Sequence, residues 1–158
     1  MMKYKDCEET GRKSERQFIS DYCSVYGVIA YKCKADMYCD ITEHWDVWTH
    51  VHAKIDIKSR RFLKRGGEYA DGYIFEIKNV NGDIGWGYGR AECIAYERED
   101  CWHIVLLEEL QKLVARNNYQ IHNRKHYDRD DEFVWIPADH VEPIIYDLIQ
   151  KTTLNHNL

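Results

Sequence analysis

Residues 44–61, with the sequence HWDVWTHVHAKIDIKSRR, constrain the fold of this chain more than any other stretch. We expect residues 53–59 to form a strand, in which successive side chains point to opposite faces. Lys54, Asp56 and Lys58 then share one face, and the two isoleucines between them point the other way into a core. The segment therefore predicts a half-buried strand that carries a carboxylate and an ammonium group side by side.

A second strand-like run, residues 44–51, comes just before it and contains Asp46. A hairpin near residues 50–54 would bring Asp46 alongside Asp56. Two neighbouring carboxylates repel each other and favour a cation between them. Oxygen ligands of this kind suit Mg²⁺, which usually takes one or two carboxylates together with water and substrate phosphate. The hairpin therefore predicts a Mg²⁺ site, in which Mn²⁺ would substitute.

The order of these residues resembles the core motif of the PD-(D/E)xK nuclease superfamily, which has the restriction-endonuclease-like fold. Its members carry an Asp, then a gap, then Asp/Glu-x-Lys, and Asp46, Asp56 and Lys58 match these positions. Trp45 stands where many members have Pro. Many members also place a Glu on the first helix, and Glu15 fits that pattern. The order is most similar to that of archaeal Holliday junction resolvases and phage-type endonucleases.

This resemblance implies a metal-dependent DNA endonuclease that hydrolyses phosphodiester bonds, with branched or junction DNA in phage or cellular DNA processing as one candidate substrate. Asp46, Asp56 and Glu15 would hold the metal, and Lys58 would orient or help deprotonate the attacking water. Junction resolvases act as symmetric dimers, so a homodimer is implied in the same way. The main alternative is a non-catalytic module on the same fold that binds nucleic acid or protein.

A second acid-x-Lys pair, Glu76 and Lys78, lies in residues 73–80, which predict another strand. Either this pair or Asp56 with Lys58 satisfies the motif, and we prefer Asp56 with Lys58. If the two strands are neighbours in one sheet, Glu76 and Lys78 would lie near the same site and assist it. The simpler interpretation is a cross-strand ion pair.

Candidate DNA contacts follow the proposed metal site. A basic cluster without any acid comprises Arg60, Arg61, Lys64 and Arg65. Such a cluster suits contacts with DNA phosphates, although a solvated loop explains it equally well. Trp86 and Tyr88 lie in the glycine-rich residues 79–89, where they would stack on unpaired bases. Alternatively, Trp86 would close one end of the core.

The chain of 158 residues suits a single domain with a hydrophobic core. We expect one α/β domain over residues 1–158, with a mixed central sheet flanked by helices and loosely ordered ends at 1–11 and 152–158. No apolar run of membrane-spanning length occurs, and the N-terminus is too polar for a signal peptide, so a cytoplasmic protein without a membrane partner is expected. The formal net charge of −5 argues against a generally basic nucleic-acid binder but not against a local electropositive site. Without a Walker A motif, no nucleotide cofactor is expected.

The remaining elements follow from hydrophobic periodicity. We expect helices at 12–25 and 108–116, and strands at 28–33, 92–96, 102–107 and 132–136. A final helix would start near Asp139, with its buried stripe formed by Val141, Ile144, Ile145, Leu148 and Ile149. Residues 117–131 read as an irregular polar segment. On a helix, His122 and His126 would be spaced to bind a metal, but no third ligand is evident, so a surface loop or phosphate contacts are preferred.

Overall fold

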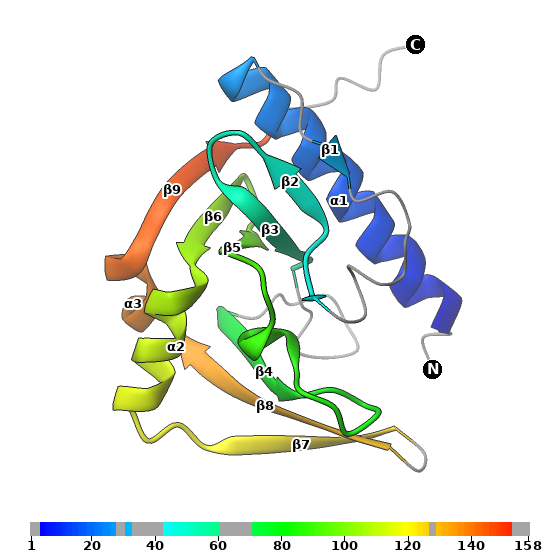
Figure 1. Ribbon diagram of the computed structural model, residues 1–158, viewed down its shortest axis with the longest axis vertical. Coiled ribbons are helices and arrows are strands. Elements are labelled where there is room, and N and C mark those ends of the chain that lie inside the picture. Colours follow the sequence, from blue (N-terminus) through cyan, green and yellow to red (C-terminus); the bar gives the residue numbers. More distant parts are fainter. Residues whose placement is uncertain (1–3, 28–30, 33–42, 61–70, 127–128, 153–158) are drawn as a thin grey trace.

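The structure, a computed structural model, describes residues 4–27, 31–32, 43–60, 71–126 and 129–152. It is an α/β protein with a six-stranded sheet, in the order β1-β2-β3-β5-β6-β9, and a three-stranded sheet, in the order β4-β8-β7 (Figure 1). The helical elements are α1 (Tyr4–Tyr26), η2 (Trp86–Tyr88), α2 (Leu107–Arg116), α3 (Ala138–Val141) and η3 (Glu142–Ile144). The strands are β1 (Tyr31–Lys32), β2 (Val47–Thr49), β3 (Ala53–Lys58), β4 (Gly72–Lys78), β5 (Cys93–Glu97), β6 (Cys101–Leu106), β7 (Ile121–His126), β8 (Arg129–Pro137) and β9 (Ile145–Gln150).

The six-stranded sheet is mixed, as the sequence predicts, because β3 runs parallel to β5 while the other neighbouring pairs are antiparallel. One face of this sheet is covered by α1. Phe18 and Tyr22 of α1 are fully buried there, and Phe18 meets the ring of Trp102 edge-on at 5.2 Å. Ile55 and Ile57 of β3 belong to the same core, as expected from their alternation along the strand.

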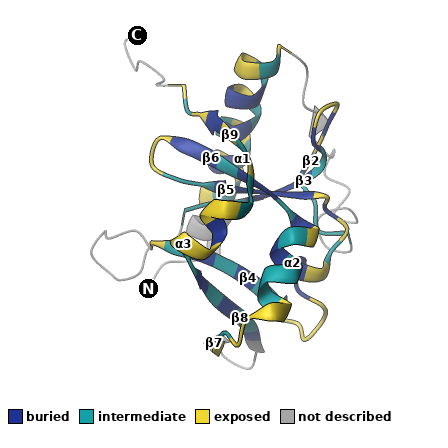
Figure 2. Ribbon diagram, turned by 90° about the vertical axis from the view of Figure 1, so that its left-hand side faces the viewer, coloured by how far each residue is buried: buried dark blue, intermediate teal, exposed yellow. Residues whose placement is uncertain are grey.

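A second core fills the space between the other face of this sheet and the three-stranded sheet. It combines Ile94 and Tyr96 of β5 with Tyr73 and Phe75 of β4, and α2 closes it from the side through Leu110. The buried residues run along the strands between these layers, whereas α2 is mostly half-buried and exposed at its C-terminal end (Figure 2). Side chains on that face of β3 therefore point towards the junction between the two sheets.

Three of the sequence predictions about elements are wrong. The first helix begins at Tyr4 and passes through Gly11, although residues 1–11 were expected to be loose. Residues 121–126 form strand β7, paired with β8, where an irregular segment was expected. The C-terminal segment ends in strand β9 and not in a helix, because Pro143 lacks an N–H and cannot continue a helix beyond its first turn.

Within the described part of the chain, no helix is long and apolar enough to cross a lipid bilayer.

Candidate functional site

The β2–β3 hairpin brings two aspartates together. Val47 pairs with Ile55 across the hairpin, and the Asp46 N–H donates to the Ile55 carbonyl at 2.9 Å. Asp46 lies just before β2, and its carboxyl group accepts a hydrogen bond from the Ile57 N–H at 2.7 Å and interacts with the Asp56 carboxyl group. The predicted juxtaposition of the two aspartates is therefore present in the fold.

Lys58 completes a compact charged group on the same face. Its Nζ lies 2.7 Å from Asp56 Oδ1 and 4.7 Å from the centre of the Trp86 ring. The Asp56 side chain is only 4% exposed, whereas the Lys58 side chain is 25% exposed. Lys58 also borders a cavity of about 30 Å³, enough for one or two water molecules. The ammonium group is thus held between a buried carboxylate and an indole while one side reaches solvent.

Burial and repulsion change the protonation of Asp46. Burial raises the pKa of Asp46 to about 8, with the negative charge of Asp56 as the second cause. The Lys58 ammonium and a hydrogen bond from the Ile57 N–H, at 2.7 Å to Asp46 Oδ2, act in the opposite direction on this pKa. The hydrogen bond between the two carboxyl groups raises the pKa of Asp46 further.

The donor set fits a hard divalent cation. Asp46, just before β2, and Asp56 of β3 supply two carboxylates. Mg²⁺ commonly takes one or two carboxylates from a protein when water and substrate phosphate fill the remaining positions. No group of three or more His, Cys, Asp or Glu side chains converges in the described residues, so a closed zinc site is not formed among them.

Glu15 lies on α1, which covers the opposite face of the sheet. The hydroxyl of its neighbour Ser14 donates to Glu97 Oε2 at 2.7 Å, which fixes this part of α1 at the carboxyl end of β5. Because β3 and β5 are parallel, Lys58 lies at the same end of the sheet. Glu15 is therefore at the correct end but comes from the other face, and its part in metal binding stays a prediction.

Glu76 and Lys78 do not lie on a strand next to β3, so that expectation is wrong. They belong to β4, which pairs with β8 in the three-stranded sheet. Glu76 Oε2 accepts a hydrogen bond from the Trp86 N–H at 3.2 Å, and Lys78 Nζ lies 3.6 Å from Glu132. The described contacts of this second acid-x-Lys pair are structural.

Of the two alternatives for Trp86, its burial supports a place in the core and contradicts stacking on a base. Trp86 is only 6% exposed and packs against Phe75 and Tyr96, so it belongs to the core. The glycines around it allow close packing: a Cβ at Gly87 would lie 2.5 Å from the carbonyl oxygen of residue 76 and from the Phe75 ring. Tyr88, by contrast, is 50% exposed.

The structure bears only partly on the predicted basic cluster, and it argues against a metal site at the histidine pair. Arg61, Lys64 and Arg65 lie outside the described residues, and Arg60 forms an ion pair with Glu99 at 3.3 Å. The spacing of residues 122 and 126 does not suit a shared metal, because both are on strand β7 and four residues of strand span roughly 13 Å.

Sequence reasoning missed a polar cluster next to Asp46. Glu43 accepts a hydrogen bond from Trp45 Nε1 at 2.7 Å and forms ion pairs with Lys54 and Arg90 at 3.1 and 3.2 Å. The shared face of Lys54 and Asp56 was readable from alternation. Arg90 follows η2 in a turn, and a turn has no hydrophobic periodicity from which the position of Arg90 could be predicted.

Comparison with known proteins finds no matching family model, curated protein or solved structure.

Proposed function

We propose that the chain is a metal-dependent endonuclease that hydrolyses DNA phosphodiester bonds, on a restriction-endonuclease-like arrangement of helix α1 and the β2–β3 hairpin. The observation that carries this proposal is the pair of interacting carboxyl groups of Asp46 and Asp56, with Lys58 held 2.7 Å from Asp56. Burying two carboxylates side by side costs free energy that a structural role does not require. A cation site repays that cost when the cation binds.

Each residue has a distinct role. Asp46 and Asp56 would hold Mg²⁺, which would lower the pKa of a bound water and offset charge on the phosphate. Lys58, with its partly exposed ammonium group, is placed to orient the attacking water and to stabilise negative charge that develops on the phosphate. Trp86 and Asp56 restrict the position of that ammonium group.

The test is cleavage of labelled branched, flapped, duplex and single-stranded DNA with Mg²⁺, Mn²⁺ or EDTA. We expect metal-dependent cutting by the wild-type chain, loss of detectable cutting in Asp56→Ala, and a reduced rate in Lys58→Ala that still binds metal. Removing a general acid–base or charge-stabilising group typically lowers a rate by about 10²–10⁴-fold.

Glu76→Ala is the matched control, because it removes the acid of the second acid-x-Lys pair. Full activity of Asp56→Ala together with an inactive Glu76→Ala would show that the catalytic pair is Glu76 with Lys78 and that the proposed assignment is wrong. A wild-type chain that binds DNA without cutting it under any metal condition would favour the non-catalytic binding module.

A further inference from the structure

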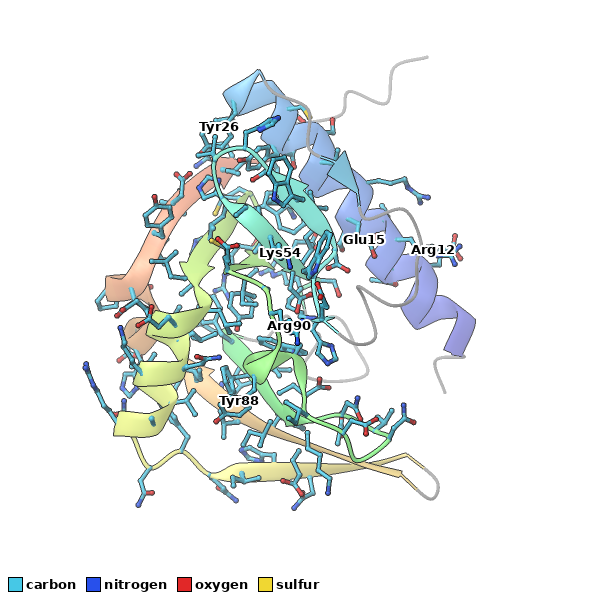
Figure 3. All side chains as sticks on the ribbon, in the orientation of Figure 1. Arg12, Glu15, Tyr26, Lys54, Tyr88 and Arg90 are labelled. Atoms are coloured by element: carbon cyan, nitrogen blue, oxygen red, sulfur yellow. The ribbon has the colours of Figure 1, made fainter. Side chains whose placement is uncertain are left out.

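Three side chains beside the aspartate pair are not used by the proposed hydrolysis: Lys54, Tyr88 and Arg90. Lys54 lies on β3, two residues before Asp56, and therefore on the same face of the sheet. Tyr88 ends η2, and Arg90 follows it on the way to β5. The three side chains lie one after another between β3 and η2 on the side of the molecule seen in Figure 3.

The two cations of this group are fixed in place by their neighbours. Lys54 Nζ lies 3.1 Å from one carboxylate oxygen of Glu43 and 5.3 Å from the centre of the Trp45 ring. Arg90 Nη1 lies 3.2 Å from the other oxygen of Glu43, and the Arg90 N–H donates to the Glu43 carbonyl at 2.7 Å. One carboxylate thus orients two cations, and these three side chains together carry one net positive charge.

These side chains remain accessible to a ligand. The Arg90 side chain is 72% exposed, the Lys54 side chain 32%, and Tyr88 50%. The Tyr88 ring meets Phe75 at an interplanar angle of 88°, so it is supported from the core while much of it faces solvent. Arg and Lys bind backbone phosphates, and a supported, exposed aromatic ring stacks on a base.

The aromatic ring distinguishes between nucleic-acid ligands. In a duplex the base faces are stacked on one another and are not offered to a side chain, whereas an unpaired strand exposes them. We propose that a single-stranded stretch of DNA lies along Lys54, Arg90 and Tyr88 beside the aspartate pair, with phosphates on the two cations and a base on Tyr88. This inference rests on the proposed nuclease function and narrows its substrates to those with an unpaired segment.

The experiment measures binding without cleavage. A fluorescein-labelled oligothymidine is titrated with protein in EDTA, and fluorescence anisotropy is followed at several salt concentrations. Tyr88→Ala is expected to weaken binding roughly fivefold or more, because it removes one stacked base, whereas Tyr88→Phe keeps the ring and the affinity. Arg90→Ala is expected to weaken binding and to lower the slope of log K against log[salt] by about 0.7, the value for one phosphate contact on a single strand.

Lys112→Ala is the matched control. It also removes one positive charge, from an ion-paired lysine on α2 that is 43% exposed. It should leave affinity and salt slope within error of wild type. If Lys112→Ala weakened binding as much as Arg90→Ala, the effect would come from net charge, and the proposed single-strand site would be rejected.

The outcomes separate this inference from the proposed function. If the wild-type chain cuts DNA and both Tyr88→Ala and Arg90→Ala bind the oligonucleotide normally, the proposed single-strand site is rejected and the proposed nuclease function is retained. If the two variants lose binding as expected but the wild-type chain never cuts DNA, the single-strand site is supported and the nuclease function is rejected. Tighter binding of a duplex than of oligothymidine would also overturn the inference.

Discussion

Asp46 illustrates how much a single residue's environment determines the chemistry available to this chain. Its carboxyl is buried next to Asp56, and these two causes raise its pKa to about 8. A lysine at 2.7 Å from Asp56 does not reverse this shift, because the ammonium charge compensates only part of the cost of burial. The result is a site that holds a proton at neutral pH and that a divalent cation would have to deprotonate.

The raised pKa predicts a pH-dependent stability in metal-free protein. Unfolded Asp46 loses its proton near the ordinary aspartate pKa of 3.8, whereas folded Asp46 keeps it until about pH 8. The stabilising contribution of this proton is therefore present at low pH and is lost as pH rises from about 4 to about 8. For one proton the loss is at most about 1.4 kcal/mol per pH unit.

Asp46→Asn isolates this contribution, because it removes the titrating proton and keeps the shape of the side chain. Measured by urea unfolding in EDTA, the variant should gain stability relative to wild type as pH rises towards 8. The comparison with wild type is needed because burial also lowers the pKa of His52. That shift makes the fold less stable as pH falls, which is opposite to the pH dependence from Asp46. Parallel pH profiles for the two proteins would contradict the assignment.

At the scale of elements, η2 links the second core to the proposed site. Its backbone packs so closely on β4 that a Cβ at Gly87 would lie 2.5 Å from Phe75 ring atoms and a backbone oxygen. The same turn carries Trp86, whose ring faces Lys58. A displacement of η2 would therefore reach the ammonium group.

Gly87→Ala is expected to destabilise the fold by about 1–3 kcal/mol, the usual cost of overpacking, and to lower any cleavage rate. Gly11→Ala is the control: a Cβ there meets nothing within 4 Å, and alanine in a helix interior is favoured over glycine by about 0.5–1 kcal/mol. Denaturant unfolding should thus give changes of opposite sign for the two variants. A harmless Gly87→Ala would contradict the close packing.

The aspartate pair could be predicted from the sequence because it depends on local rules. Alternation along residues 53–59 assigned Asp56 and Lys58 to one face, and a short hairpin brought Asp46 close to them. These relations involve neighbouring strands joined by a turn. They required no knowledge of the rest of the fold.

The failures come from long-range pairing. Strand β7 is polar because it lies at the edge of its sheet, so its sequence resembles a loop. Ile145 and Ile149 fit a helical stripe and a strand equally well, and once Pro143 has ended the helix, the pairing of β9 with β6 stabilises the strand. Whether the strand of Glu76 and Lys78 lies next to β3 was left open for the same reason, because the sequence of a strand does not identify the strand it pairs with.

On the scale of the whole molecule, the proposed metal site lies where the two sheets meet. Asp56 and Lys58 are on the face of the six-stranded sheet that turns towards β4, and Lys58 contacts Trp86 of the second core. A cation bound by Asp46 and Asp56 would therefore stabilise elements of both layers. Binding to the native state raises its stability by about 2.7 kcal/mol when the ligand is at 100 times its Kd.

Mg²⁺ should accordingly raise the thermal unfolding temperature by several degrees, since each kcal/mol is worth roughly 2–4 °C in a protein of this size. The shift should be larger at pH 8.5 than at pH 6, because at pH 6 the cation must displace the proton of Asp46. Asp46→Asn and Asp56→Asn should abolish it at constant ionic strength, whereas Asp83→Asn, which removes an exposed charge of the same kind, should retain it. Equal shifts in all four proteins would mean that Mg²⁺ acts as a general counterion and that the two aspartates do not bind it.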